Sequence, residues 1–438
     1  MDTIEAAEIL EEIVTKTQVV YLRTEPDVLD FTVHAPGKVI ISGAQKKVEL
    51  DVDRHNVMQV ASLLAITIFD KDCMPMVVSW NIKSLFSYFK AHQVNVEPPS
   101  TKIIELQVIE KFLGIDGKQP ENLVEAIDRT KAVSKTNNWK PLYKSLHLPL
   151  MLEVLPALET VPLLDEDTKK SKFAFYEIEG QTNGRLRCPK KFEQCYIPHT
   201  IGPNEKHSLK PRGYDQYFFV SDIKHCEVSV LQWLSEDKQL AEIIKSGNDL
   251  YSEIYKVITR DDCETDRKRQ LGKNIFLKVI YGMGAKGLSE DLHLPLEVTK
   301  ELIDRTYSSF PTATGWIKAR QQEARTKGVV EDYFGRPRTF TEDNAYLARN
   351  FVVQSVAATV CLEKMVDLSN KFKTKPARLS FSVHDAYGFT CIKEHVVDTY
   401  KTVTEIIKSP SLLCPGLVLK VESKVGKRLD SMKVIGQS

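Results

Sequence analysis

The chain has 438 residues, of which 42% are hydrophobic, and its 60 Lys and Arg residues nearly balance its 59 Asp and Glu residues. At roughly 150 residues per domain, this length predicts about three units. The near-zero net charge excludes a histone-like or ribosomal polycation, because such proteins carry binding charge over the whole surface. The sequence contains no apolar run of about 18 residues and no leader of charged then apolar residues. We therefore expect a cytosolic protein without a membrane span.

The eight cysteines are scattered singly, without the Cys-x-x-Cys or Cys/His spacing of a zinc site. We therefore predict reduced and mostly buried thiols, which are neither disulfide-bonded nor metal ligands. They stand at positions 73, 188, 195, 226, 263, 361, 391 and 414.

The N-terminal part alternates short strands and helices, which predicts a small α/β domain. Its β-type runs are rich in Val, Ile and Leu, and the last of them opens directly into a helix over 84–89. Beyond a break at Pro98-Pro99-Ser100 the pattern turns helical over about 121–160, until a polar run at 165–172 marks a boundary. The β-type runs are residues 19–22, 38–41 and 76–80.

The second half begins with strand-like segments over 173–178 and 217–220, and a helix directly follows the second of them. Amphipathic helices then dominate from about 236 to 330, and a long helix is predicted over 345–372. A tight turn at His384-Asp385 predicts a hairpin, and a helix and a last strand end the chain. The predicted helix breaks are 282–284 and 310–311, the hairpin strands are 379–383 and 387–391, and the last strand is 417–421.

One predicted helix carries cations at steps of four. Arg269, Lys273, Leu277 and Tyr281 lie near one helical stripe. No acidic residue stands between them to pair with the cations at i+4, which predicts an uncompensated cationic face suited to a triphosphate. The alternative is an ordinary solvated face. Residues 267–340 hold 14 Lys and Arg against 8 Asp and Glu, so the sequence predicts a local basic patch here.

Two aspartates stand at predicted strand edges. Asp222 closes the strand over 217–220, and Asp385 sits at the tip of the predicted hairpin. Carboxylates aimed by rigid strands can bridge two Mg²⁺ ions about 3.5–4 Å apart for an in-line phosphoryl transfer. Because the two aspartates are far apart in the sequence, their spacing alone leaves open whether they meet.

Three ordered motifs carry these residues: VSDIKHCEVSVL, RQLGKNIFLKVIYGMGAKGLS and SVHDAYGF. Their order and spacing resemble the polymerase motifs of family A DNA polymerases, the bacterial DNA polymerase I and phage replicative group. The resemblance covers about residues 173–438, and the compact layout is similar to that of phage members. Supporting matches are Thr182-Asn183-Gly184-Arg185-Leu186 with Tyr196-Ile197-Pro198, Gly335-Arg336-Pro337-Arg338, and Arg349-Asn350 with Gln354.

The resemblance implies an α+β fold with a right-handed polymerase palm and fingers. It implies template-directed addition of deoxynucleotides to a primer 3' end by two-metal phosphoryl transfer, which needs positioning and charge neutralisation but no protein nucleophile. Asp222 and Asp385 would hold two Mg²⁺ ions, for which Mn²⁺ could substitute. Lys273 would assist the departure of pyrophosphate as a cation or acid.

The resemblance also implies the binding residues. Arg269 and Lys273 would grip the incoming dNTP. Glu227 would act as the steric gate against a ribose 2'-OH, and Tyr281 would close the pocket of the nascent base pair. Contacts to primer–template DNA would come from Arg185, Asn350, Gln354 and His384.

Four positions depart from the family pattern. Leu277 replaces an aromatic residue that packs on the deoxyribose and base, which puts the usual discrimination against sugars lacking a 3'-OH in doubt. Ala386 replaces the third carboxylate of the His-Asp-Glu triplet, and because that carboxylate is a peripheral metal contact, its loss should tune activity more than abolish it. Tyr251 stands where a phosphate-contacting histidine is expected, and Tyr346 where an arginine is expected.

The N-terminal part resembles, more faintly, the ribonuclease H-like proofreading exonuclease domain of the family. Arg23, beside Glu25, and Leu85 stand at positions of expected aspartates, and Glu105 stands near another. The metal site would then be broken, so we expect no proofreading. The alternative is an unrelated small α/β domain.

The resemblance divides the chain into five parts. The stretch between the exonuclease-like part and the palm is too short for a full thumb, so we expect low processivity without an accessory protein. A separate exonuclease is a second expected partner. The parts are a degenerate exonuclease-like domain (1–120), a reduced thumb or connector (121–172), the first part of the palm (173–235), the fingers (236–340) and the second part of the palm (341–438).

Two rival functions remain. A non-catalytic polymerase-like DNA-binding subunit is disfavoured because Asp222, Asp385, Arg269 and Lys273 are all retained. A single-subunit RNA polymerase is disfavoured by Glu227, since such an enzyme must admit the 2'-OH. The expected location is the cytoplasm, which is the host cytoplasm if a phage encodes the chain.

Overall fold

The computed structural model describes residues 3–16, 19–30, 35–69, 75–96, 103–136, 139–189, 192 and 194–437. By its contacts the chain divides into two compact units. Unit 1 comprises residues 1–222, 361–407 and 421–438, and unit 2 comprises residues 223–360 and 408–420. The borders of these units do not coincide with the predicted limits of the five parts. The five-part division remains a prediction.

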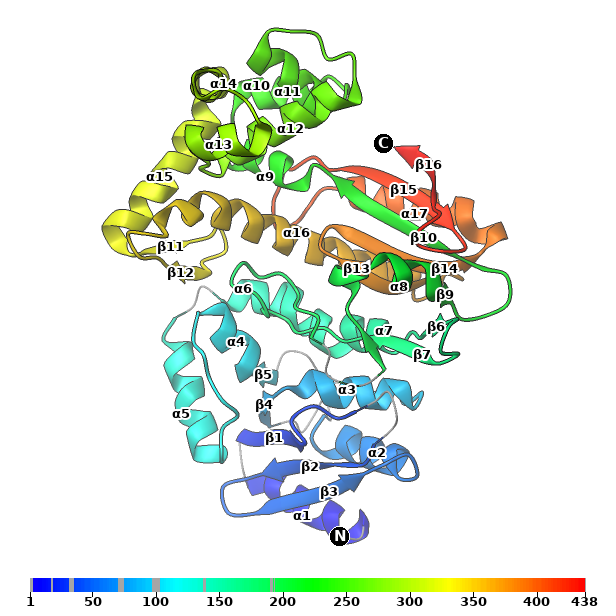
Figure 1. Cartoon of the computed structure of the whole chain (residues 1–438). Coiled ribbons are helices and arrows are strands. Elements are labelled where there is room, and N and C mark those ends of the chain that lie inside the picture. The colour runs from blue at the N-terminus through cyan, green and yellow to red at the C-terminus, as the bar shows by residue number, and fades with distance from the viewer. Residues whose placement is uncertain are drawn as a thin grey trace. The chain divides into compact units, whose positions relative to one another are not determined.

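Unit 1 begins with α1 (Thr3–Lys16), β1 (Val19–Glu25), β2 (Gly37–Ser42), β3 (Lys47–Val52), α2 (Val57–Thr67), β4 (Met76–Trp80), α3 (Ile82–Ala91) and β5 (Ile103–Glu105). The strands form one sheet in the order β3-β2-β1-β4-β5 (Figure 1). β1, β4 and β5 are parallel, whereas β2 is antiparallel to β1 and to β3. The three predicted strands and the helix after the third are confirmed, and the break at 98–100 lies outside the described residues.

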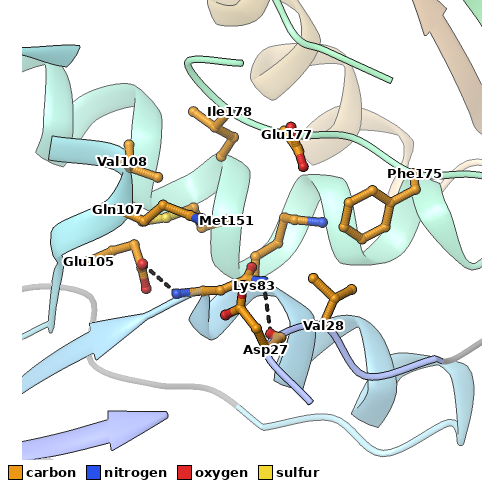
Figure 2. Close-up of a pocket in the computed structure, with 11 residues that line it drawn as sticks. Asp27, Val28, Lys83, Glu105, Gln107, Val108, Met151, Phe175, Glu177 and Ile178 are labelled. Atoms are coloured by element: carbon orange, nitrogen blue, oxygen red, sulfur yellow. Dashed lines mark hydrogen bonds between the residues drawn. The ribbon is translucent and has the colours of Figure 1, made fainter. Parts of the chain in front are cut away.

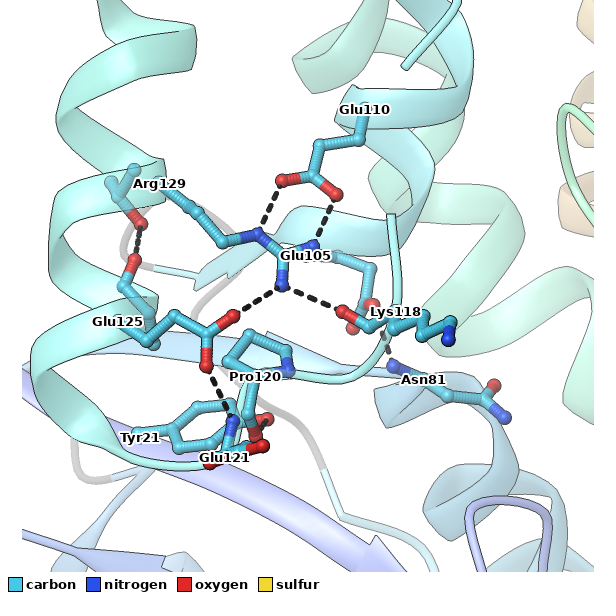
Figure 3. Close-up of polar contacts among 11 residues, drawn as sticks. Tyr21, Asn81, Glu105, Glu110, Lys118, Pro120, Glu121, Glu125 and Arg129 are labelled. Carbon is cyan, nitrogen blue, oxygen red and sulfur yellow. Dashed lines mark hydrogen bonds and ion pairs between the residues drawn. The ribbon is translucent and has the colours of Figure 1, made fainter. Parts of the chain in front are cut away.

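The helix α4 (Leu106–Phe112) follows β5 and was not part of the predicted helical stretch over about 121–160. That stretch is confirmed as α5 (Leu123–Ser134), α6 (Lys140–Leu142), the π-helical turns η2 (Tyr143–His147) and η3 (Leu150–Val154), and α7 (Leu155–Glu159). Arg129 on α5 makes paired hydrogen bonds to the carboxylate of Glu110 on α4 and donates to the Lys118 carbonyl at 2.6 Å (Figure 3). Tyr21 on β1 donates to the Pro120 carbonyl at 3.0 Å. These contacts tie α5 and the loop before it to α4 and to the sheet.

A smaller sheet follows, with the order β8-β7-β6-β9. The strand predicted over 173–178 is wrong beyond Ala174, because Glu177 makes only an isolated bridge with Arg187 and Glu179 has a positive φ of 52°. The elements are β6 (Leu163–Asp165), β7 (Ser171–Ala174), β8 (Cys195–Tyr196), the 3₁₀ turn η4 (Pro198–Thr200), α8 (Pro203–Ser208) and β9 (Leu209–Pro211).

The third sheet contains β10 (Gln216–Lys224), β13 (Arg378–Val383), β14 (Ala386–Ile392), β15 (Lys420–Gly426) and β16 (Lys433–Gln437). Its order is β13-β14-β10-β15-β16, so the predicted hairpin lies beside the strand over 217–220 (Figure 1). Phe218, Phe219 and Phe389 are fully buried in this sheet. The last strand predicted over 417–421 is misplaced, because β15 starts at Lys420 and β16 follows it. The 3₁₀ turn η6 (Lys393–His395) and α17 (Val396–Lys408) connect β14 toward β15.

Unit 2 is mostly helical, as predicted. Its helices are α9 (Cys226–Ser235), α10 (Lys238–Lys245), α11 (Leu250–Thr259), α12 (Asp266–Ile280), α13 (Ala285–Leu292), α14 (Leu296–Ser309) and α15 (Pro311–Lys327). Asp237, Asp249 and Thr265 cap the N-termini of α10, α11 and α12 by accepting backbone N–H hydrogen bonds. The breaks predicted at 282–284 and 310–311 are confirmed.

After α15 the chain forms the hairpin β11 (Val329–Glu331) and β12 (Pro337–Thr339), the 3₁₀ turn η5 (Ala345–Leu347), and the long helix α16 (Ala348–Phe372). Val330, Phe340 and Phe351 share one buried cluster that joins the hairpin to α15 and to the start of α16. The long helix predicted over 345–372 is confirmed as α16.

Seven cysteines within the described ranges are free thiols, and six of them are buried, as predicted. Cys73 lies outside those ranges. Among the described helices, none combines the length and the apolar character needed to cross a membrane.

Candidate functional site

The register of β10 and β14 brings the two predicted aspartates to neighbouring strands. The strands pair antiparallel with Asp222 opposite Ala386, and Asp385 directly precedes Ala386 in the turn after β13. Asp222 and Asp385 therefore lie at the same end of adjacent strands. β10 continues to Lys224, so Asp222 lies inside the strand rather than closing it as predicted. Its side chain is exposed because side chains alternate along a strand and its neighbour Ser221 is buried.

Buried hydrogen bonds hold this part of the sheet rigid. Ser221 Oγ lies 2.7 Å from Ser423 Oγ, and the Tyr387 hydroxyl donates to the Cys361 carbonyl at 2.7 Å. The Tyr176 hydroxyl accepts from the Ser382 backbone N–H at 2.9 Å, just before the turn that carries Asp385. These contacts fix the backbone on which the two aspartates stand.

The donor set at this edge fits a hard divalent cation. Carboxylate oxygens suit Mg²⁺, which keeps several water and phosphate ligands rather than needing a full protein cage. Across the described residues, no group of three or more His, Cys, Asp and Glu side chains has an arrangement that could hold a metal ion. A divalent cation held by Asp222 and Asp385 would take water, backbone or substrate oxygens as its other ligands.

One of the predicted DNA-binding residues, His384, packs on a histidine that sequence reasoning missed. The imidazole of His384 stacks on that of His199, with ring centroids 4.5 Å apart and an angle of 25° between the planes. Burial, followed by the nearby charges of His384 and Arg185, lowers the pKa of His199 to about 4. The sequence around His199 carries no pattern that could have singled it out.

The predicted triphosphate-binding residues gather where α11 packs on α12. The Tyr251 ring centroid lies 5.7 Å from Cζ of Arg269 and 5.4 Å from Nζ of Lys273. Gly272 allows this close packing, because a Cβ there would lie 2.7 Å from Cβ of Tyr255 and 2.8 Å from the Tyr251 carbonyl oxygen. Arg269, Lys273 and Tyr251 therefore form one cluster, which we call the α11–α12 cluster.

The prediction of an uncompensated cationic face on α12 is wrong for Arg269. Arg269 Nε lies 2.9 Å from Oδ1 of Asp249, the N-cap of α11. Lys268 and Lys278 pair with Asp261 and Asp291. The sequence argument considered only partners within the same helix, whereas these carboxylates come from other segments. Sequence reasoning did not single out Asp249, although an aspartate directly before an amphipathic run is a common helix N-cap and could have found it.

His225, at the N-terminus of α9, joins the α11–α12 cluster. Its backbone has a positive φ of 56°, and its ring packs edge-on against Tyr251 with centroids 4.7 Å apart. Burial lowers the pKa of His225 to about 4, and the neighbouring Lys224 contributes to this shift. The imidazole is therefore neutral near pH 7. Sequence reasoning did not single out this residue.

Glu227 and Tyr281 meet within unit 2. The Tyr281 hydroxyl donates to Oε2 of Glu227 at 2.6 Å, which joins the start of α9 to the end of α12. Leu277 lies one turn before Tyr281 and is half-buried. The two residues predicted for the sugar gate and the base-pair pocket are therefore in direct contact.

Asn350 and Gln354 lie one turn apart on α16, and both are half-buried. The buried Oδ1 of Asn350 has no hydrogen-bond partner among the residues that the structure describes. Tyr346, just before this helix, is 47% exposed.

The sequence model of DNA polymerase family A matches residues 163–431, which is more than half of the chain. The chain belongs to DNA polymerase family A. Its similarity to DNA polymerase I of Helicobacter pylori is 26% identity over 76% of this chain and 40% of that protein. The thermostable DNA polymerase I of Thermus aquaticus is 29% identical over 48% of this chain and 27% of its own length. This family A chain thus spans 40% or less of the length of the curated relatives that it matches.

A solved structure shares the fold of this family A chain: the POL domain of Pol1 from M. smegmatis, in complex with DNA primer-template and dNTP. The TM-score is 0.76 with 13% identity, and the match covers 96% of this chain and 98% of that one. The predicted fold class, an α+β polymerase fold, is confirmed.

In unit 1 of this family A chain, a cavity of about 30 Å³ is lined both by the N-terminal α/β part, with Asp27, Lys83 and Glu105, and by the later segment that carries Glu177 (Figure 2). This volume holds roughly one or two water molecules. Nζ of Lys83 lies 2.6 Å from Oε1 of Glu159 and 3.9 Å from the centroid of the Phe175 ring. A buried ammonium group therefore stands beside the carboxylates of this cavity.

The residues at the expected exonuclease positions are engaged elsewhere. Glu105 is fully buried, and its carboxylate accepts hydrogen bonds from the backbone of Asn81 and Ile82 and from the Ser79 hydroxyl, at 2.6 to 2.9 Å. Burial raises the pKa of Glu105. Nη1 of Arg23 lies 2.7 Å from Oε1 of Glu25. Leu85, at another expected aspartate position, is buried. The Glu105 carboxylate thus joins β5 to the start of α3.

Proposed function

We propose that this chain is a template-directed DNA polymerase that adds deoxynucleotides to a primer 3' end by two-metal phosphoryl transfer. The observation that carries the proposal is the β10–β14 register, which brings Asp222 and Asp385 to the same end of adjacent strands. Two Mg²⁺ ions held there, or Mn²⁺ in their place, would neutralise the charge of the reacting phosphates. Family membership and the DNA polymerase I relatives support the same activity.

The α11–α12 cluster is proposed to bind the triphosphate. Asp249 holds the guanidinium of Arg269 through Nε, and the terminal Nη groups have the planar geometry that phosphate oxygens prefer. Lys273 adds a point charge and a proton for the departing pyrophosphate. The Tyr251 ring packs beside both cations and limits where they can move.

The proposed partners are primer–template DNA and dNTPs, with DNA contacts from Arg185, His384, Asn350 and Gln354. An accessory processivity protein and a separate exonuclease are further proposed partners, and the proposed location is the cytoplasm. The proposed parts are the five predicted above, with the exonuclease-like domain at 1–120.

A primer-extension assay with the purified chain tests the proposal against its rivals. We expect extension of a DNA primer with dNTPs and Mg²⁺, and far less with rNTPs. Binding of duplex DNA without extension would favour the non-catalytic DNA-binding subunit. Efficient use of rNTPs would favour the single-subunit RNA polymerase.

Glu227→Ala should raise ribonucleotide incorporation by about tenfold or more relative to deoxynucleotides, because a smaller side chain leaves room for the 2'-OH. Competition between dATP and rATP in single-nucleotide extension measures this selectivity. Tyr281→Phe is the matched control, since it removes the hydrogen bond to Glu227 but keeps the carboxylate. Unchanged selectivity of Glu227→Ala would remove Glu227 from the gate.

We expect no 3'–5' exonuclease activity. Hydrolysis by two metal ions needs several converging carboxylates. Glu105 instead caps the start of α3, and Lys83 places an ammonium group in the neighbouring cavity. A labelled primer with a mismatched 3' end, incubated with Mg²⁺ or Mn²⁺ without dNTPs, should keep its length. Shortening that persists in Asp222→Asn would reveal an intact exonuclease site.

A further inference from the structure

His384 stands in a backbone conformation that a side chain makes costly. Val383 pairs with Ala386, so His384 and Asp385 form the turn of the hairpin, and His384 has a positive φ of 54°. Glycine adopts this region without steric cost, whereas residues with a Cβ are disfavoured there. Such a conformation persists only where the surrounding structure holds the residue in place.

His199 provides that support. His199 lies in the 3₁₀ turn η4, which packs against β13. It directly follows Pro198, and the proline ring fixes the backbone angle φ of Pro198 at the start of this turn. The exposed His384 ring lies flat on the half-buried His199 ring, with centroids 4.5 Å apart. Because His199 is neutral near pH 7, it exerts no like-charge repulsion on His384 or on the nearby Arg185.

We propose that His199 is a positioning residue for primer extension, which acts by holding the imidazole of His384 at the primer end. This inference rests on the proposed function, since it takes His384 as a contact of the primer terminus. His199 itself touches no reacting atom. Loss of the stack would let the His384 ring shift and the primer end with it, and misplacement by about 1 Å can cost up to a hundredfold in rate.

The test replaces the stacking ring while keeping its bulk. In single-turnover extension at saturating dNTP, His199→Leu should lower the maximal rate about tenfold or more, because leucine fills the site without a flat ring. The Kd for primer–template DNA, measured by fluorescence anisotropy, should change less than about threefold. His199→Phe should restore the rate to within about threefold, because phenylalanine keeps the stack. His207→Leu is the matched control: His207 is exposed on α8 and pairs with Asp430, and its substitution should leave the rate unchanged.

A double-mutant cycle distinguishes positioning from a general effect on the fold. If His199 acts through His384, adding His199→Leu to His384→Ala should change the rate less than about twofold. Additive effects, or a His199→Phe variant as slow as His199→Leu, would overturn the proposal.

A second readout does not depend on activity. In NMR spectra of histidine-labelled protein, the ring resonances of His384 should lose their ring-current shift in His199→Leu but keep one in His199→Phe. Unchanged His384 resonances would overturn the positioning role even if the wild-type chain did not extend primers. A wild-type chain that showed the shift but no extension would instead refute the proposed function.

Discussion

Asp222→Asn and Asp385→Asn should each reduce primer extension by about a thousandfold or more, while DNA binding survives. Each substitution removes a negative charge and a metal-ligand oxygen but keeps the size of the side chain. Asp222 is exposed and Asp385 is half-buried, so neither change should disturb the core of the sheet. Single-turnover extension measures the rate, and fluorescence anisotropy measures the affinity for primer–template DNA.

The matched control is Asp398→Asn. Asp398 lies in the same unit on α17 and pairs with Lys375, away from the β10–β14 turn end. Its substitution should leave extension unchanged. Near-normal extension by Asp222→Asn or Asp385→Asn would remove that aspartate from the mechanism, and partial rescue by Mn²⁺ would support direct ligation.

Glu159→Ala should destabilise unit 1 by about 3–5 kcal/mol, because it leaves the ammonium group of Lys83 buried without a counter-charge. The Lys83 side chain is only 6% exposed and the Glu159 side chain is fully buried. Glu159 also accepts hydrogen bonds from the Ser87 hydroxyl at 2.7 Å and from the Tyr176 backbone N–H at 2.8 Å. One carboxylate therefore joins α3, α7 and the chain after β7. Urea denaturation followed by Trp fluorescence measures the loss.

An exposed ion pair in the same unit provides the comparison. Glu153 pairs with Lys373, and both side chains are 53% exposed, so Glu153→Ala should cost less than about 1 kcal/mol. Lys83→Met should cost less than Glu159→Ala, because Glu159 then keeps its two other hydrogen-bond donors. Equal losses for Glu159→Ala and Glu153→Ala would show that the buried pair does not stabilise the contact between α3 and α7.

Short-range sequence patterns predicted the helices, strands and turns whose formation depends mainly on neighbouring residues. The hairpin of β13 and β14, the strand–helix pair β4–α3 and the helix breaks of unit 2 all follow from short-range periodicity and from Gly and Pro. The same reasoning extended the strand at Phe173 too far and misplaced the last strand. Both errors occur at the ends of strands, because where a strand begins or ends depends on its partner strand rather than on its own residues alone.

For the candidate site, the sequence indicated which residues to propose for the chemistry: Asp222, Asp385 and the stripe of Arg269, Lys273 and Tyr281. Residue type and spacing singled out these groups, and the resemblance of their motifs to those of family A polymerases supplied their expected roles. The tertiary structure decided their surroundings. Asp249 reaches Arg269 from another helix, His199 reaches His384 from a distant turn, and Glu105 turns inward to cap α3. Each of these contacts joins segments that are far apart in the chain. The free energy of such a contact depends on burial and on the distance between the groups, and neither can be read from the spacing of residues along the sequence.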